Sequence, residues 1–160
     1  MKPVTALKRG STIGIIGGGQ LGRMLAMAAR KMNYRTVILD PEPNCPAGQV
    51  ADGQIADAYS SSDASLALAR QSDVVTYEFE NVDADSVEAA SGITAVYPSA
   101  SVLRVTQHRL KEKAALADAK ILVTPFRAVK SIRDLQSAGV DIGYPMVLKT
   151  ATDGYDGKGQ

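Results

Sequence analysis

The stretch IGIIGGGQLG, from Ile13 to Gly22, narrows the choice of folds for this chain more than any other segment. Its opening residues are apolar and mostly β-branched, which is typical of a buried strand. Three adjacent glycines follow, and they let the backbone approach an anion with no Cβ in the way. The next residues begin a helix, whose first N–H groups can hold that anion. The stretch therefore predicts a strand, an anion-binding loop and a helix in direct succession.

This helix is expected to bury one apolar face and to lead into a second strand. Its apolar residues recur at intervals of three and four positions, as a helix with one buried side requires. A strand is predicted over Thr36–Asp40, and a crossover of this length makes it parallel to the first strand. A short helix is predicted after Pro46. The face predicted to be buried consists of Leu21, Met24, Leu25, Ala28, Ala29 and Met32.

Helices and strands continue to alternate up to residue 98. Alternation of this kind predicts an α/β fold with a Rossmann-like, doubly wound parallel sheet. The further elements predicted are a helix from about Asp63, a strand over Val74–Glu80, a helix within 82–90 and a strand over 94–98.

The composition changes near residues 100–108, where we predict a boundary between a first domain, 1–105, and a second domain, 106–160. Residues 106–160 are too few to build a full second core, so we expect them to be part of a longer chain. The elements predicted there are helices over 108–119 and 131–139 and a strand over Met146–Thr150, followed by a second glycine-rich loop.

The overall composition argues against several kinds of partner. With 18 Lys and Arg against 17 Asp and Glu, the net charge is +1, so no broad basic surface is expected for nucleic acid. No run of about 20 apolar residues is present, so we expect neither a membrane partner nor a secretory signal. Cys45 is the only cysteine, which rules out an internal disulfide and favours a reducing cytoplasm.

The first glycine loop suits more than one ligand. Gly17, Gly19 and Gly22 have the G-x-G-x-x-G spacing, and Asp40 ends the next strand, as in dinucleotide-binding folds. The phosphate of a different ligand fits the same loop, and a tight turn without a ligand is the third interpretation. The motif alone does not separate them.

Acidic residues lie at the end of the strand predicted over Val74–Glu80. Glu78 and Glu80 are two positions apart, so they share one face if the strand continues. The carboxyl ends of parallel strands line the ligand crevice, where a carboxylate can accept hydrogen bonds from ribose hydroxyl groups. Glu78 is the stronger candidate, and a solvated strand end is the alternative.

The second glycine loop suits a nucleotide triphosphate. Lys149 is predicted late in a buried strand, where an unpaired ammonium is costly and a phosphate would compensate its charge. The glycines from Gly154 onward allow the loop to close over the phosphates and exclude water. Arg109 is a candidate for a second cation, whereas His108 is expected to be exposed. A plain hairpin loop is the alternative.

These segments occur in the order seen in one enzyme family. GIIGGGQLGRM, PAGQVAD, YEFENV, QHRLKEK and VLKTATDGYDGKGQ together resemble the ATP-dependent 5-(carboxyamino)imidazole ribonucleotide synthases, over about residues 11–160. The resemblance implies a pre-ATP-grasp domain followed by the start of an ATP-grasp domain. It also implies a cytoplasmic ligase of purine biosynthesis that forms a homodimer. One departure is His108, where the family more often has Asp or Asn.

The reaction implied by this resemblance uses three small-molecule substrates. ATP phosphorylates bicarbonate to carboxyphosphate, and the amine of 5-aminoimidazole ribonucleotide then takes up the carboxyl group, leaving ADP and phosphate. Mg²⁺ neutralises the phosphates in reactions of this kind. The resemblance places the Mg²⁺ ligands and the adenine pocket after residue 160, with no metal ligand in this segment, so we expect these residues alone to be inactive.

The resemblance assigns the two glycine loops to different substrates. Gly19, Gln20 and Leu21 would hold the ribonucleotide, with its 5′-phosphate as the bound anion, and Glu78 would meet its ribose. The second loop would hold ATP. Tyr155 and Asp156 would be catalytic, near the bicarbonate and the amine. The ATP ligands implied are Arg109, Lys149, Gly154, Tyr155, Asp156, Gly157, Lys158, Gly159 and Gln160.

Three alternatives stay open. An NAD(P)-binding oxidoreductase domain explains the first loop and Asp40, but not Lys149 beside a second glycine loop. A formate-dependent glycinamide ribonucleotide transformylase has the same fold, although Gln20 favours the carboxylase because transformylases tend to carry Glu there. A non-catalytic nucleotide-sensing module would lack the carboxylates that bind Mg²⁺.

Overall fold

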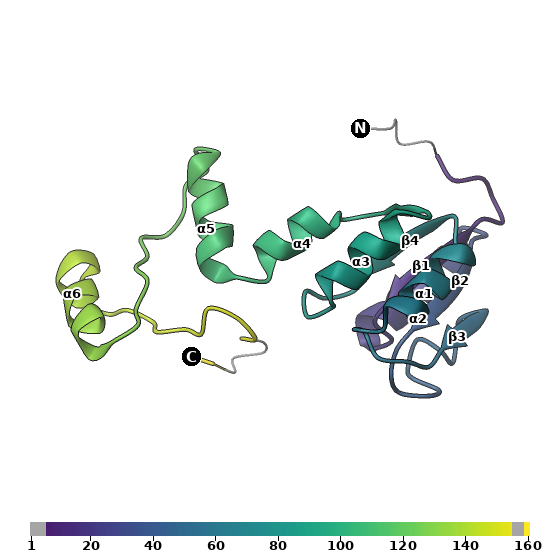
Figure 1. Cartoon of the computed structure of the whole chain (residues 1–160), viewed down its shortest axis with the longest axis horizontal. Coiled ribbons are helices and arrows are strands. Elements are labelled where there is room, and N and C mark those ends of the chain that lie inside the picture. The colour runs from purple at the N-terminus through teal and green to yellow at the C-terminus, as the bar shows by residue number, and fades with distance from the viewer. Residues whose placement is uncertain (1–5, 155–158) are drawn as a thin grey trace. The chain divides into compact units, whose positions relative to one another are not determined.

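Five parallel strands form the sheet of the first of two units, Met1–Leu103 and Arg104–Gln160, in the computed structural model. The structure describes residues 6–154 and 159–160. The sheet has the order β3-β2-β1-β4-β5, so β1 lies in the middle and the chain builds outward from it in both directions (Figure 1). This arrangement confirms the predicted doubly wound α/β fold. The strands are β1 (Thr12–Ile16), β2 (Arg35–Leu39), β3 (Gly53–Ile55), β4 (Val74–Tyr77) and β5 (Ala95–Val96).

Helices cover both faces of this sheet, because successive residues of a strand point to opposite sides. Ile15 and Ile38 pack with Ala26 of α1 on one face. Ile16 and Leu39 pack on the other face, against α2 and α3. The helices of the first unit are α1 (Gln20–Lys31), α2 (Ser62–Arg70) and α3 (Ala84–Ser91); α4 (Ala100–Thr106) spans the boundary, and α5 (Arg109–Asp118) and α6 (Ile132–Ile142) follow it.

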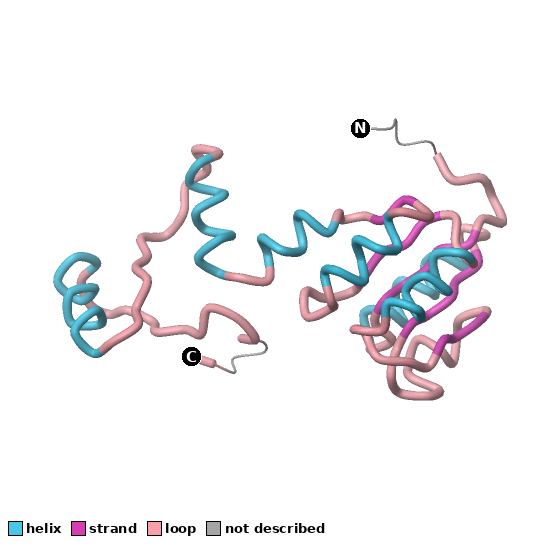
Figure 2. The backbone as a smooth tube through the Cα atoms, in the orientation of Figure 1, coloured by secondary structure: helices cyan, strands magenta, loops and turns pink. Residues whose placement is uncertain are grey.

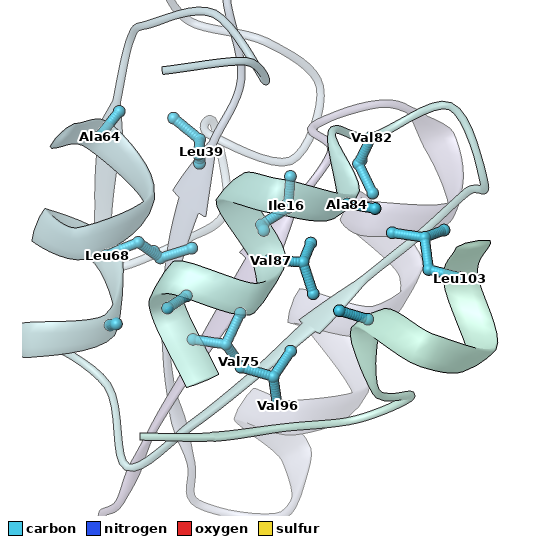
Figure 3. Close-up of a cluster of buried hydrophobic side chains, with 13 residues drawn as sticks. Ile16, Leu39, Ala64, Leu68, Val75, Val82, Ala84, Val87, Val96 and Leu103 are labelled. Atoms are coloured by element: carbon cyan, nitrogen blue, oxygen red, sulfur yellow. The ribbon is translucent and has the colours of Figure 1, made fainter. Parts of the chain in front are cut away.

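The larger hydrophobic core lies between α2, α3 and the sheet. The side chains of Leu68, Val75 and Val87 gather there and are fully buried (Figure 3). Leu103 of α4 is also fully buried in this cluster. The core therefore holds the carboxyl ends of β1 and β4 in a fixed relation to each other.

The outward face of α1 differs from the prediction. The buried residues of α1 are Gly22, Ala26 and Ala29, so only Ala29 of the predicted face is buried. Small residues let the helix backbone approach the sheet closely, and the larger apolar side chains turn toward solvent instead. We call the exposed residues Met24, Leu25, Ala28 and Met32 the α1 stripe; Met24 and Met32 are 57% and 62% exposed.

Several element boundaries were also wrong. The edge strand β3 was missed, because its three residues show no clear alternation of apolar and polar side chains. The segment after Pro46 forms hydrogen-bonded turns rather than a helix. The first turn of a helix is costly to form, and here no further turns follow to compensate that cost. β4 ends at Tyr77, three residues before the predicted end at Glu80.

The second unit contains α5 and α6 and, among its described residues, no strand (Figure 2). The strand predicted over Met146–Thr150 is therefore wrong for this structure. A strand completes its backbone hydrogen bonds on a neighbouring strand, and the described part of this unit offers none. The helix predicted over 131–139 continues to Ile142, where Gly143 ends it with a φ of +86°.

In the described ranges, no helix has the length and apolar character that crossing a membrane requires.

Asp83 begins α3, because its side chain accepts a hydrogen bond from the Ser86 N–H at 2.7 Å. We expect Asp83→Ala to lower the free energy of unfolding by about 1 kcal/mol, since an N–H of the first turn loses its acceptor. Asp83→Asn keeps that acceptor and serves as the control. Urea denaturation followed by circular dichroism measures both variants, and equal stability of the Ala and Asn variants would contradict this role.

Candidate functional site

The candidate site lies where the sheet order changes direction, at the carboxyl ends of β1 and β4. The two strands are parallel neighbours, with Ile16 paired to Tyr77. The glycine loop leaves β1 directly after Ile16, and Glu78 follows directly after Tyr77. Crevices at such points are the usual ligand sites of open α/β sheets. The fold therefore brings together the first glycine loop and the acidic strand end, which the sequence separates by about 60 residues.

Glu78 caps the start of α1. Its carboxylate accepts a hydrogen bond from the Gly19 N–H at 3.0 Å and another from the Gly22 N–H. Gly19 is the N-cap residue and has no side chain to offer, and the first turn of α1 contains no acidic residue. A helix start carries unpaired N–H groups and a partial positive charge. Glu78, directly after the neighbouring strand β4, accepts hydrogen bonds from two of these N–H groups and places a negative charge beside the helix start.

Gly22 is required because of this close approach. A Cβ at position 22 would clash with the carbonyl oxygen of Gly17 and would lie 2.7 Å from Oε2 of Glu78. A side chain here would force apart the turn of the loop and the carboxylate that caps the helix. The third glycine of the motif thus serves helix–strand packing, as it does in dinucleotide-binding folds.

Asp40 has a different role from the one that a dinucleotide site would give it. The residue as a whole is 6% exposed. It accepts hydrogen bonds from the Gly18 N–H at 2.7 Å, the Glu42 N–H at 2.9 Å and the Tyr59 hydroxyl at 2.6 Å. A carboxylate that binds the ribose of NAD must face the ligand. Asp40 instead faces the protein, which counts against the NAD(P)-binding alternative.

The hydrogen bonds of Glu78 also bear on the phosphate predicted in this loop. The N–H groups of Gly19 and Gly22 already bind a carboxylate, and the negative charge of Glu78 offsets the partial positive charge of the helix start. A phosphate would have to displace Glu78 or lie beside it. The geometry therefore does not support a 5′-phosphate held by these two N–H groups.

Gln20 and Leu21 remain available to a ligand. Both lie in the first turn of α1, where the backbone N–H groups have no carbonyl of the helix to bind, and both residues are exposed. Glu78 is half-buried beside them. Because β4 ends at Tyr77, the regular alternation that would place Glu80 on the same face as Glu78 is interrupted.

The second glycine loop has its own contacts within the second unit. Nη2 of Arg109 donates to the carbonyl oxygen of Gly154 at 3.1 Å, and the backbone N–H of Arg109 donates to Ala151 at 2.9 Å. The N–H of Thr150 donates to the carbonyl of Gly159 at 2.7 Å. The structure thus brings Arg109 to the loop with which it was predicted to act.

Other predicted residues of this loop have a different setting. Lys149 is exposed and lies outside any strand, so the cost of a buried ammonium does not apply. His108 is half-buried rather than exposed, and its buried Nδ1 has no hydrogen-bond partner among the residues that the structure describes. Gln160 is exposed. Tyr155, Asp156, Gly157 and Lys158 lie outside the described residues.

Tyr59 is a residue of this region that the sequence did not indicate. It is a single tyrosine in the connection between β3 and α2, with no motif around it. Only the sheet order brings that connection to the carboxyl end of β2, beside Asp40.

The cap on α1 makes a direct prediction for Gly22. We expect Gly22→Ala to lower the free energy of unfolding by about 2 kcal/mol, since the Cβ displaces either the Gly17 carbonyl or Glu78. Gly53→Ala is the matched control, because the nearest atom to its Cβ would be 3.7 Å away; its effect should stay below about 1 kcal/mol. Urea denaturation measures both, and equal effects would show that the close approach at Gly22 is unimportant.

Comparison with known proteins identifies relatives along the whole chain. Residues 10–107 match the family described as the ribonucleotide synthetase preATP-grasp domain, and residues 114–160 match the ATP-grasp domain. The N5-carboxyaminoimidazole ribonucleotide synthase of Brucella melitensis is 48% identical over 156 residues, which cover 98% of this chain and 43% of that protein. The chain thus spans less than half the length of this relative.

Solved structures show the same similarity. The N5-carboxyaminoimidazole synthetase of Staphylococcus aureus complexed with ADP superposes with a TM-score of 0.89 at 43% identity, covering 96% of this chain and 41% of that one. The Aspergillus clavatus synthase in complex with ADP and 5-aminoimidazole ribonucleotide has a TM-score of 0.82 at 32% identity, with 90% and 39% covered. With its glycine loop, its sheet order and the match over residues 10–107, the chain belongs to the ribonucleotide synthetase pre-ATP-grasp family.

Proposed function

We propose that this chain is part of an ATP-grasp ligase that carboxylates 5-aminoimidazole ribonucleotide with ATP and bicarbonate in purine biosynthesis. The observation that carries the proposal is the meeting of Glu78 with the Gly19–Gly22 turn at the ligand edge of the sheet, in a chain 48% identical to an N5-carboxyaminoimidazole ribonucleotide synthase. Residues 1–105 would form the pre-ATP-grasp domain and residues 106–160 would begin the ATP-grasp domain. The matched ranges 10–107 and 114–160 support this division.

The ribonucleotide would bind at the first glycine loop through its sugar rather than its phosphate. Glu78 retains lone pairs that can accept hydrogen bonds from the ribose hydroxyl groups. The N–H groups of Gln20 and Leu21 can donate to the oxygens of the same hydroxyls, and Gly19 leaves room for the sugar. Because the carboxylate of Glu78 makes this edge negative, the 5′-phosphate would point away from it toward cationic residues elsewhere in the enzyme.

ATP would bind at the second glycine loop. Arg109, already hydrogen-bonded to Gly154, and the exposed Lys149 would contact its phosphates, together with the loop through Gly159 and Gln160. Transfer of the γ-phosphoryl group to bicarbonate gives carboxyphosphate and ADP. Attack of the ribonucleotide amine on its carbonyl carbon then forms the new C–N bond and releases phosphate.

Within this second loop, Tyr155 and Asp156 are our candidates for catalysis, with Gly157 and Lys158 completing the phosphate contacts. Mg²⁺ would screen the charge that moves between the phosphates. Among the described residues, no group of three or more His, Cys, Asp or Glu side chains could hold a metal ion. The family resemblance places the Mg²⁺ ligands after residue 160, and we propose them there.

A homodimer in the cytoplasm is the state that we propose for the enzyme. The α1 stripe of Met24, Leu25, Ala28 and Met32 is an apolar surface on one helix and its C-cap residue, and such surfaces on folded proteins commonly mark contacts with another protein. We assign it to a second copy. The free, buried thiol of Cys45 fits the reducing conditions of the cytoplasm.

Two variants test the division of labour between the loops. We use the term extended enzyme for a protein of the relatives' length that contains this chain. In it, Glu78→Gln should raise the KM for 5-aminoimidazole ribonucleotide by about 10- to 100-fold, as expected for loss of a charged hydrogen-bond acceptor, with little change in the KM for ATP. Lys149→Ala should raise the KM for ATP, with little change in the KM for 5-aminoimidazole ribonucleotide.

The assay is phosphate release with ATP and bicarbonate, with and without the ribonucleotide. Each variant is the other's control. No ribonucleotide-dependent turnover in the unaltered extended enzyme would refute the function. The same kinetic pattern in both variants would refute the division between the loops.

The α1 stripe is tested by the oligomeric state. We expect Met24→Lys in the extended enzyme to weaken dimerisation by about tenfold or more, because a lysine ammonium would be buried at the contact. Ile93→Lys is the matched control, since Ile93 is also exposed, at 44%, but lies outside α1. Light scattering across a dilution series measures both. A monomeric unaltered enzyme, or equal weakening by both variants, would contradict the assignment.

A further inference from the structure

We infer that Asp40 and Tyr59 are positioning residues for the ribonucleotide: together they fix the first glycine loop and connect it to the strand end that carries Glu78. Neither residue faces the ligand edge in the way that Glu78 does. Asp40 would position the loop through its hydrogen bond with Gly18, and Tyr59 would position the strand end through its ring contact with Phe79. The kinetic part of this inference rests on the proposed function, whereas the structural part does not.

Gly18 is held from several directions. Its N–H donates to Asp40 at 2.7 Å, and its carbonyl accepts a hydrogen bond from the Ala47 N–H at 2.9 Å. A Cβ at this position would clash with Sγ of Cys45 and lie 2.8 Å from Cβ of Asp40. Because Gly18 immediately precedes the N-cap residue Gly19, its placement sets where the first N–H groups of α1 point.

Asp40 is the centre of this arrangement. Its Oδ2 accepts hydrogen bonds from both Gly18 and Tyr59, and its Oδ1 accepts one from Glu42. A carboxylate that is almost fully buried is stable only while such donors compensate its charge. Removal of one donor would therefore change the position of the carboxylate and of the Gly18 backbone that depends on it.

Tyr59 connects the two sides of the site. Its hydroxyl binds Asp40, and its ring meets the ring of Phe79 edge-on, with centroids 5.3 Å apart at an angle of 74°. Phe79 is the residue directly after Glu78. Burial and the hydrogen bond to Asp40 raise the pKa of Tyr59, so the hydroxyl stays protonated and keeps donating. Tyr59 thus contacts both Asp40, which binds the glycine loop at Gly18, and Phe79, which is the neighbour of Glu78 in the chain.

The test compares two tyrosines that each lose one hydroxyl. Tyr59→Phe removes the hydrogen bond to Asp40 and keeps the ring against Phe79. Tyr34→Phe is the matched control, because the Tyr34 hydroxyl donates to the Leu7 carbonyl at 3.3 Å, away from the site. In the extended enzyme, Tyr59→Phe should raise the KM for 5-aminoimidazole ribonucleotide about tenfold, with kcat and the KM for ATP within about twofold. Tyr34→Phe should change none of these.

A second measurement on the chain of 160 residues does not need activity. Amide hydrogen exchange, followed by NMR, should become about tenfold faster at Gly18 and Gly19 in Tyr59→Phe, while the amide of Val75 in the core keeps its rate. Asp40→Asn should change the same two amides in the same direction. It also covers the case in which Tyr59→Phe is too unstable to measure.

The outcomes separate the inference from the function. Unchanged exchange at Gly18 and Gly19 in both variants would overturn the inference, as would equal kinetic effects of Tyr59→Phe and Tyr34→Phe. A rise in the KM for ATP alone would also overturn it. If the unaltered extended enzyme shows no carboxylation, the proposed function fails, and the exchange rates still decide whether Asp40 and Tyr59 position the loop.

Discussion

The hydrogen bonds between Glu78 and the start of α1 hold the candidate site together. The helix begins at a glycine that has no side chain to cap it, and its first turn has no acid of its own. The acceptor comes from the end of β4, 56 residues beyond Gly22. It arrives there because the sheet order places β4 directly beside β1. The glycine loop, the helix and the ligand edge all depend on that one adjacency.

The same hydrogen bonds determine which kind of ligand the glycine loop can bind. A glycine-rich turn before a helix attracts anions when its N–H groups are free. Here carboxylates from the ends of β2 and β4, the strands on either side of β1, accept these hydrogen bonds: Asp40 binds the N–H of Gly18, and Glu78 binds the N–H groups of Gly19 and Gly22. A loop with this pattern favours a ligand that brings hydroxyl groups. For this reason we propose a ribose, rather than a dinucleotide phosphate, as the ligand of this glycine motif.

The packing of α1 follows from side-chain size. Gly22, Ala26 and Ala29 form a narrow ridge that lets the helix lie close to the sheet, on Ile15 and Ile38. The more apolar side of the same helix, with Met24 and the rest of the α1 stripe, therefore faces outward. Hydrophobic periodicity alone would place these larger residues inside. Close helix–sheet contact near a glycine loop reverses that order, and it leaves an apolar surface that a partner can cover.

Local sequence patterns were sufficient to predict the alternation of helices and strands, the parallel sheet, the glycine turn after β1 and the place of Glu78 beyond a strand of that sheet. Each of these follows from side-chain periodicity or from backbone freedom within a few neighbouring residues. The partners of Glu78, the internal role of Asp40, the contribution of Tyr59 and the outward side of α1 required the tertiary structure. They depend on which strands become neighbours and how closely a helix approaches them, and contacts between residues far apart in the chain leave no periodic signal in it.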